Sequence, residues 1–166
     1  MSGGPTPVIN MTLRGAVEEA YKTEKIDQIY GMRNGLEGLL GKGIISLHEN
    51  MKAITKSSEQ PGAILGRSRY SPSEKEFKEI LQFLEEENIE IFCYIGGNGS
   101  SRTVAELHRR SVAAGKNIRL FVHIPKTIDN DLSGTDRLEA YQLGKKAVRY
   151  ALEGYSGGNG WIEPNF

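Results

Sequence analysis

The chain has 166 residues, a length that suits one domain with a sizeable core and is short for two. Its 21 Lys and Arg balance 21 Asp and Glu, and this zero net charge argues against a nucleic-acid or membrane-surface partner. The 20 glycines exceed the roughly 12 expected from average usage; because they follow no three-residue period and alternate with apolar segments, they exclude collagen and argue against a disordered linker.

The first part of the chain predicts a helix, a strand and a glycine-rich turn segment. Residues 26–32 form a candidate strand, and five glycines between positions 31 and 43 indicate turns around a short helix. The helix comes first, and its apolar face would be formed by four residues at helical spacing: Leu13, Ala16, Val17 and Ala20.

Two helix–strand units follow. The sequence Ser-Pro-Ser-Glu at residues 71–74 predicts a capping box with proline at the first helical position, ahead of an apolar face that begins at Phe77. Residues 89–95 and 118–124 are short apolar runs rich in β-branched and aromatic residues, as in buried parallel strands. The segment 100–114 between them predicts a helix that stops near Gly115.

The chain closes with a predicted helix over residues 138–152, and residues 154–166 predict either a turn before one short strand or a loose tail. Alternating helices and strands indicate an α/β fold, with an open, mostly parallel sheet and flanking helices in a single domain over residues 1–166.

The single cysteine and the length of the apolar runs indicate the cellular compartment in which we expect the protein. The single cysteine, Cys93, lies in an apolar run that predicts a buried, unreactive thiol and no disulfide. No run approaches the roughly 20 residues of a membrane span, and the N-terminus lacks the basic and apolar regions of a secretory signal. We therefore expect a cytoplasmic protein with no membrane partner.

The loop after the first strong strand, Gly-Gly-Asn-Gly-Ser at residues 96–100, has the composition of a phosphate cradle. Ligands of open parallel sheets bind beyond the carboxyl ends of the strands, glycines permit close backbone approach, and a helix N-terminus attracts anions. Taken alone, the loop fits phosphate binding and a tight turn capped by Ser100 equally well. No Gly-Lys-Ser/Thr follows, which excludes a P-loop.

The loop after the second strand combines a cation, a hydroxyl and carboxylates within residues 125–131. Asp129 could take a proton from a substrate hydroxyl, while Lys126 and Thr127 could hold the charge of a transferring phosphoryl group. The alternative, which this loop alone favours, is a polar turn in which Asp131 or Asn130 satisfies backbone donors.

Two further segments could contact phosphate. Gly-Gly-Pro-Thr-Pro at residues 3–7 has a cradle-like composition, but its prolines remove donors and a frayed terminus fits equally well. Arg67 and Arg69 offer paired guanidinium donors, although either one alone is more typical of a solvated surface. The histidines lack metal-ligand spacing, and we expect all three to be structural or solvated: His48, His108 and His123.

Five segments, in this order, resemble the 6-phosphofructokinase family, including its diphosphate-dependent branch. The resemblance spans residues 2 to about 135, and the last of the five segments is the most specific. The segments are Gly-Gly-Pro-Thr-Pro-Val-Ile-Asn (3–10), Ile-Tyr-Gly (29–31) with Gly-Leu-Glu-Gly-Leu-Leu (35–40), Leu-Gly-Arg-Ser-Arg (65–69), Ile-Gly-Gly-Asn-Gly-Ser (95–100) and Pro-Lys-Thr-Ile-Asp-Asn-Asp-Leu (125–132). The resemblance implies a glycolytic kinase that uses Mg²⁺ and transfers phosphate from ATP or diphosphate to the 1-hydroxyl of fructose 6-phosphate.

The resemblance also implies roles for individual residues. Asp129 would be the base that activates the sugar hydroxyl, Thr127 would contact the sugar-phosphate side, and Asp131 would support the loop. Arg69 would bridge phosphates. The phosphoryl-donor site would be lined by Gly3, Gly4, Gly97, Gly99 and Ser100.

Two positions point to different phosphoryl donors. Lys126 matches the diphosphate-dependent pattern, although some ATP-dependent enzymes share this lysine. Gly99 leaves room for ATP at a position where diphosphate-dependent enzymes commonly have aspartate. ATP is therefore slightly favoured, and diphosphate is the alternative.

The chain departs from the family pattern in three ways. Asn98 stands where the family usually has an aspartate that helps hold Mg²⁺, so a metal ligand there would be an uncharged amide oxygen. Almost nothing precedes Gly3, where the family has a core strand. Family members are substantially longer, and since residues 136–157 resemble their closing helix, we expect the second half, which completes the sugar-phosphate site, to be missing.

Loss of that half would impair catalysis, because positioning and charge stabilisation supply most of the acceleration of phosphoryl transfer. The alternative function is a non-catalytic module that binds nucleotide or phosphate. Such a module could also assemble with copies of itself, or with a full-length relative, through the surface that the missing half leaves.

Overall fold

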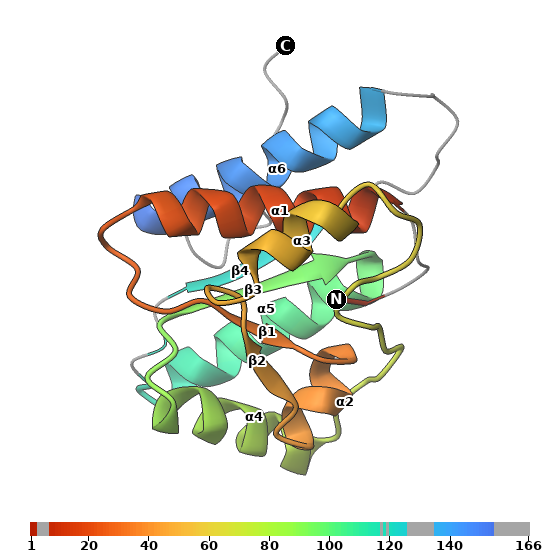
Figure 1. The fold of residues 1–166 in the computed structure, drawn as a ribbon. Helices are drawn as coiled ribbons and strands as arrows, with labels where there is room; N and C mark the ends of the chain where they lie inside the picture. The colour runs from red at the N-terminus through yellow and green to blue at the C-terminus, as the bar shows by residue number, and fades with distance from the viewer. Residues whose placement is uncertain (3–6, 117, 119, 126–134, 155–166) are drawn as a thin grey trace.

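The computed structural model describes residues 1–2, 7–116, 118, 120–125 and 135–154. Helices and strands alternate along most of this part of the chain (Figure 1). In chain order the elements are α1 (Pro7–Lys22), β1 (Tyr30–Met32), α2 (Gly35–Leu40), β2 (Ile44–Ser46), α3 (Met51–Ser57), α4 (Glu74–Glu86), β3 (Ile91–Gly96), α5 (Asn98–Ala113), β4 (Leu120–Pro125) and α6 (Thr135–Leu152).

Strands β3 and β4 form the parallel pair that the two apolar runs predict. Their register aligns Ile91 with Leu120 at one end and Gly96 with Pro125 at the other, and α5 makes the connection between them. The carboxyl ends of both strands therefore lie side by side.

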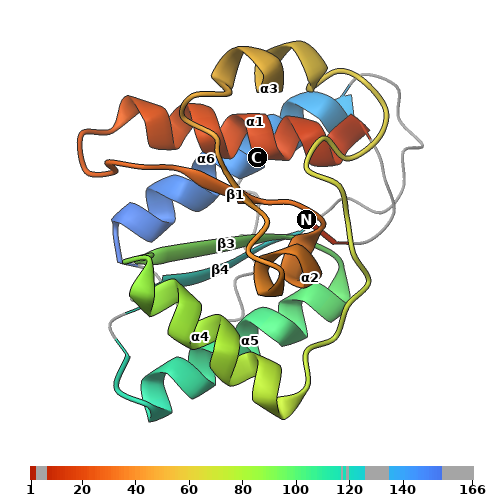
Figure 2. The same ribbon diagram turned by 60° about the horizontal axis from the view of Figure 1, so that its bottom comes forward.

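Helices cover both faces of this strand pair, with α1, α3 and α6 on one side and α4 and α5 on the other (Figures 1 and 2). Side chains of β3 and β4 alternate between two buried clusters, as expected for strands buried on both faces. Ile95 and Ile124 belong to the cluster shared with α1 and α6, whereas Phe92 and Phe121 belong to that shared with α2, α4 and α5. This arrangement confirms the predicted α/β fold.

Cys93 lies in β3 and packs partly buried against the cluster on the α1 side. Burial disfavours the thiolate and raises the pKa of the Cys93 thiol to about 12. The thiol is therefore protonated at neutral pH, in agreement with the unreactive cysteine that the sequence predicts.

Helices α1 and α6 cross at two glycines. A Cβ atom at Gly15 would lie 2.0 Å from the carbonyl oxygen of Tyr141, and one at Gly144 would lie 2.1 Å from that of Thr12. The absence of side chains at both positions allows the two backbones to approach this closely. Beside the crossing, the Tyr141 hydroxyl donates a hydrogen bond to Glu18 at 2.6 Å.

Helix α4 begins at Glu74, two residues later than the start at Pro72 that a capping box over residues 71–74 predicts. Ser73 is the N-cap: its hydroxyl accepts from the backbone N–H of Glu76 at 3.4 Å, and its own backbone N–H donates to the Glu76 carboxylate at 2.8 Å. The prediction that Pro72 is the first helical residue is therefore wrong. The Ser-x-x-Glu pattern occurs twice, at 71–74 and 73–76, and only the second forms the box.

The remaining differences from the sequence prediction concern short elements. The strand predicted over residues 26–32 is only Tyr30–Met32, and it pairs antiparallel with β2, a strand that the sequence did not predict. Helix α3 was not predicted either. Of the predicted turn or tail at 154–166, the residues from 155 onward lie outside the described part. None of the described helices is long and apolar enough to cross a membrane.

Candidate functional site

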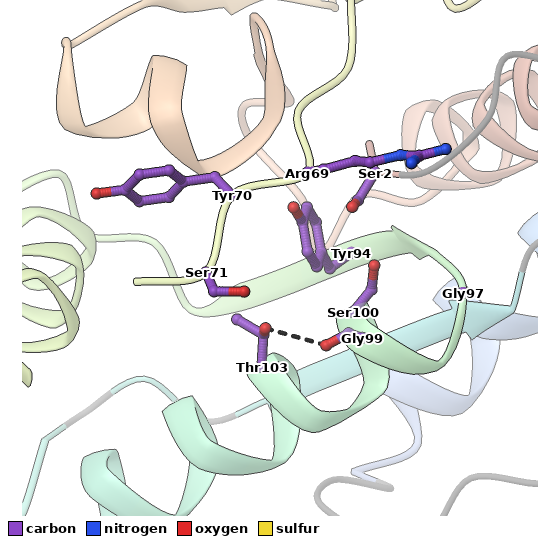
Figure 3. Close-up of a pocket in the computed structure, with 9 residues that line it drawn as sticks. All are labelled: Ser2, Arg69, Tyr70, Ser71, Tyr94, Gly97, Gly99, Ser100 and Thr103. Atoms are coloured by element: carbon purple, nitrogen blue, oxygen red, sulfur yellow. Dashed lines mark hydrogen bonds between the residues drawn. The ribbon is translucent and has the colours of Figure 1, made fainter. Parts of the chain in front are cut away.

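A cavity of about 340 Å³ lies at the carboxyl end of β3. Three parts of the chain that are distant in sequence line it: Ser2 next to the N-terminus, residues 69–71, and the turn from β3 into α5 (Figure 3). Arg69 supplies the one charged side chain, and no carboxylate occurs among the lining residues that the structure describes. The lining residues are Ser2, Arg69, Tyr70, Ser71, Tyr94, Gly97, Gly99, Ser100 and Thr103.

In the turn from β3 into α5, glycine occupies both the most crowded position and the positions that face open space. A Cβ atom at Gly96 would lie 2.1 Å from the Ser100 hydroxyl oxygen, so only glycine fits there without a shift. In contrast, Cβ atoms at Gly97 and Gly99 would meet no atom within 4 Å. These two glycines therefore face free space, in which a ligand could contact the backbone directly.

Gly97 is the N-cap of α5, and its carbonyl accepts from the N–H groups of Ser100 at 2.9 Å and Ser101 at 3.2 Å. The helix thus starts earlier than predicted, and the alternative prediction of Ser100 as its cap is wrong: Ser100 lies buried in the first turn. Free N–H groups at the start of a 16-residue helix, together with its dipole, attract anions.

The N-terminal segment holds Arg69 beside this turn. The backbone N–H of Ser2 donates to the carbonyl of Ile95 at 2.9 Å, and the Ser2 hydroxyl donates to the carbonyl of Ser68 at 2.9 Å. The Ser68 hydroxyl in turn donates to Glu37 of α2 at 3.0 Å. These bonds join residue 68 to the end of β3, so that the exposed side chain of Arg69 reaches the cavity.

His123 connects β4 to the same turn. Its Nε2 lies 3.0 Å from the carbonyl oxygen of Gly96, and since a carbonyl only accepts, Nε2 carries the proton. Burial of the half-buried imidazole lowers its pKa, which keeps the ring neutral at neutral pH. His123 thus has the structural role that the sequence predicts.

Two tyrosines of the cavity differ in how their hydroxyl groups are used. The Tyr70 hydroxyl donates to Glu76, and this bond raises the pKa of Tyr70 to about 12. The Tyr94 hydroxyl is buried and has no hydrogen-bond partner among the described residues, and burial raises its pKa. Tyr94 was not among the residues predicted for the site, although a hydroxyl within an otherwise apolar buried strand was an available signal.

The structure brings together four of the residues predicted for the donor site: Arg69, Gly97, Gly99 and Ser100. Asn98 is exposed at the start of α5 and does not line the cavity, and Arg67 does not line it either. The other predicted site residues lie outside the described part of the chain: Gly3, Gly4, Lys126, Thr127, Asp129 and Asp131.

Metal-binding groups are scarce in the part of the chain that the structure describes. No three His, Cys, Asp or Glu side chains lie close enough there to hold a metal ion. Mg²⁺ prefers carboxylate ligands, and the described lining has none. The described residues therefore do not form a magnesium site by themselves, and we assign no step to the metal.

Comparison with known proteins shows that the chain is similar to phosphofructokinases. The phosphofructokinase family model matches residues 1–145. The chain is 36% identical over 158 residues to a pyrophosphate–fructose 6-phosphate 1-phosphotransferase of Rhodospirillum rubrum, covering 95% of this chain and 38% of the relative. It is 38% identical over 147 residues to the ATP-dependent 6-phosphofructokinase 3 of Bacteroides thetaiotaomicron, covering 81% of this chain and 40% of the relative.

A solved structure agrees with these relatives. The crystal structure of the pyrophosphate-dependent phosphofructokinase from Nitrosospira multiformis superposes with a TM-score of 0.68 at 33% identity, covering 81% of this chain and 34% of that one. The chain thus spans well under half the length of the relatives it matches. Since the family model covers most of its residues, the chain belongs to the phosphofructokinase family.

Proposed function

We propose that this chain carries the phosphoryl-donor site of a 6-phosphofructokinase and binds the phosphates of ATP or diphosphate in the cavity beside β3. The observation that carries the proposal is the open cradle at Gly97 and Gly99, which lies at the N-terminus of α5 within reach of Arg69. A helix N-terminus and a guanidinium group both favour a phosphate, and no described carboxylate opposes one there.

The proposed reaction transfers phosphate to the 1-hydroxyl of fructose 6-phosphate. Pro125, the last described residue before the segment that contains Asp129, pairs in register with Gly96, and this supports a position for Asp129 near the donor cradle. In this proposal Asp129 takes the proton of the sugar hydroxyl, while Lys126 and Thr127 stabilise the charge of the transferring group and Asp131 supports the loop. Magnesium would enter with the donor phosphates.

The donor proposed first is ATP, with diphosphate as the alternative. Free space around Gly99 supports ATP, because an aspartate there would occupy the cradle. The relatives include one enzyme named for diphosphate and one named for ATP, so family membership alone does not favour either donor.

A second candidate is a module that binds the donor without catalysing transfer, alone or assembled with copies of itself or a longer relative. The observation that favours it is length, since the chain covers only 38% of the Rhodospirillum relative. In the same proposal, residues 136–157 correspond to the family's closing helix. The packing of α6 on α1 supports this correspondence.

A coupled assay with fructose 6-phosphate and either Mg·ATP or diphosphate tests the proposed reaction. Wild-type turnover should be measurable with one donor but well below the usual kinase range of roughly 1–100 per second, and Asp129→Ala should abolish it. Turnover within that range would contradict an incomplete sugar site. Donor binding without any turnover would favour the module.

A further inference from the structure

The Tyr94 side chain has an unusual position for a hydroxyl. It is 1% exposed and packs in the cluster between β3 and helices α2, α4 and α5. Its hydroxyl has no hydrogen-bond partner among the described residues, although its ring also lines the cavity. A buried hydroxyl without a partner is destabilising, and native proteins rarely keep one without a function.

Ser2 and the backbone of Leu36 lie near enough to this hydroxyl to lower the pKa of Tyr94, but neither completes a hydrogen bond with it, and burial raises the pKa by more. The Ser2 hydroxyl proton is donated to the carbonyl of Ser68. On the opposite side the start of α2 is close, since a Cβ atom at Gly35 would lie 3.3 Å from the Tyr94 oxygen. Figure 3 shows the Tyr94 hydroxyl pointing toward the segment that carries Arg69, with Ser2 and Ser100 to one side of the ring.

The polar groups at this end of the cavity are mostly hydrogen-bond donors. The Arg69 guanidinium group can only donate hydrogen bonds, and the first turn of α5 presents backbone N–H groups. The phenol proton of Tyr94 adds another donor. A ligand that satisfies them together must present several acceptor oxygens and negative charge. A phosphate group has this chemistry, whereas the hydroxyl groups of a sugar would also need acceptors.

Given the proposed donor site, on which this inference rests, we infer that the Tyr94 hydroxyl donates a hydrogen bond to a phosphate oxygen of the bound phosphoryl donor. Tyr94 is thereby a donor-binding residue in addition to those at the α5 N-terminus. The raised pKa supports this role, because the phenol stays neutral at neutral pH and donates its proton instead of repelling the anion.

The substitution Tyr94→Phe removes the hydroxyl and keeps the buried ring, so the variant should fold. Calorimetric titration of wild type and variant with Mg·ATP and with diphosphate should show a loss of affinity of about tenfold, as for one hydrogen bond to a charged oxygen. Without ligand, the thermal midpoint should stay the same or rise, because an unpaired polar group is removed. Tyr21→Phe, an exposed tyrosine on α1, should change neither quantity.

Two results would overturn the inference. Equal affinity of Tyr94→Phe and wild type would show that the hydroxyl does not contact the donor. A lower midpoint without ligand would show that the hydroxyl makes an internal hydrogen bond instead. If wild type bound neither donor, the proposed function itself would fail and the role of Tyr94 with it, an outcome distinct from failure of the variant alone.

Discussion

The side chain of His123 donates its Nε2 proton to the carbonyl oxygen of Gly96 at 3.0 Å, which joins the middle of β4 to the last residue of β3. The two loops that carry the proposed chemistry follow these strands. The bond therefore holds the donor turn against the strand that precedes residues 126–131.

Burial of the His123 imidazole makes the stability of the fold depend on pH. Burial lowers the pKa of His123 in the folded chain below its ordinary value near 6.5, so the unfolded chain binds more protons as the pH falls. The contribution of neutral His123 to the free energy of unfolding is therefore complete above the ordinary pKa and is lost as the pH drops through the lower pKa of the folded chain. Urea unfolding at about pH 7.5 and about pH 5.5 should show a smaller loss of stability for His123→Gln than for wild type.

Comparing His123→Gln with wild type separates His123 from other groups that titrate between about pH 5.5 and about pH 7.5. The α-amino group of Met1, whose pKa burial lowers to about 6, titrates in both proteins and cancels in the comparison. If His123→Gln and wild type lost the same stability between the two pH values, His123 would not be the source of the pH dependence.

Gly96 and Gly97 should respond differently to alanine. Gly96→Ala places a Cβ atom 2.1 Å from the Ser100 hydroxyl oxygen and should reduce the free energy of unfolding by about 1–3 kcal/mol. Gly97→Ala has open space and should cost less than about 1 kcal/mol, the scale of a changed N-cap, while weakening donor binding because its methyl group enters the cradle. Urea unfolding and titration with the donor measure the two effects. Equal stability of the two variants would contradict the geometry of the turn.

Gly99→Asp tests the choice of donor. The new carboxylate fits the free space at position 99 without disturbing the fold, and it would occupy room that a nucleotide needs. ATP affinity should fall by at least about tenfold, a difference of about 1.4 kcal/mol, and diphosphate affinity should change less. Equal loss of both affinities, measured by calorimetry, would contradict the role given to Gly99.

Gly144→Ala tests the contact between α6 and α1. The added methyl group would lie 2.1 Å from the Thr12 carbonyl oxygen, and backbone atoms cannot move away as a side chain can. We expect a loss of about 1–3 kcal/mol or more in the free energy of unfolding. Gln142→Ala, at an exposed position of the same helix, should stay within about 0.5 kcal/mol of wild type. Similar stability of both variants would show that α6 does not pack as described.

The sequence predicted the elements whose apolar patterns are long. β3 and β4 read as buried strands, and α1, α5 and α6 read as helices, because each buries a periodic face. The antiparallel pairing of β1 with β2 was not predicted, because strands of three residues are defined by their contacts with each other and have too few residues to show a pattern. The start of α4 was ambiguous, since two overlapping Ser-x-x-Glu patterns compete and the interaction of Glu76 with Tyr70 belongs to the second.

The candidate site was predictable where backbone chemistry defines it. Glycines after β3 indicate a cradle whatever their neighbours, and the structure shows free space at Gly97 and Gly99. The contribution of Tyr94 was not predictable, because a tyrosine in an apolar strand reads as core until its hydroxyl is found without a partner. The positions of Ser2 and Arg69 beside one another likewise depend on contacts between distant segments.

The most direct test of the central claim is calorimetric titration of the chain with Mg·ATP and with diphosphate, comparing wild type with Arg69→Ala. Arg69 lines the cavity, whereas Arg109, whose partner is Glu106 on the same helix, provides a matched control as Arg109→Ala. We expect wild type and Arg109→Ala to bind at least one donor equally well, and Arg69→Ala to bind it at least about tenfold more weakly. Absence of binding by wild type, or equal binding by Arg69→Ala, would contradict a phosphoryl-donor site in this cavity.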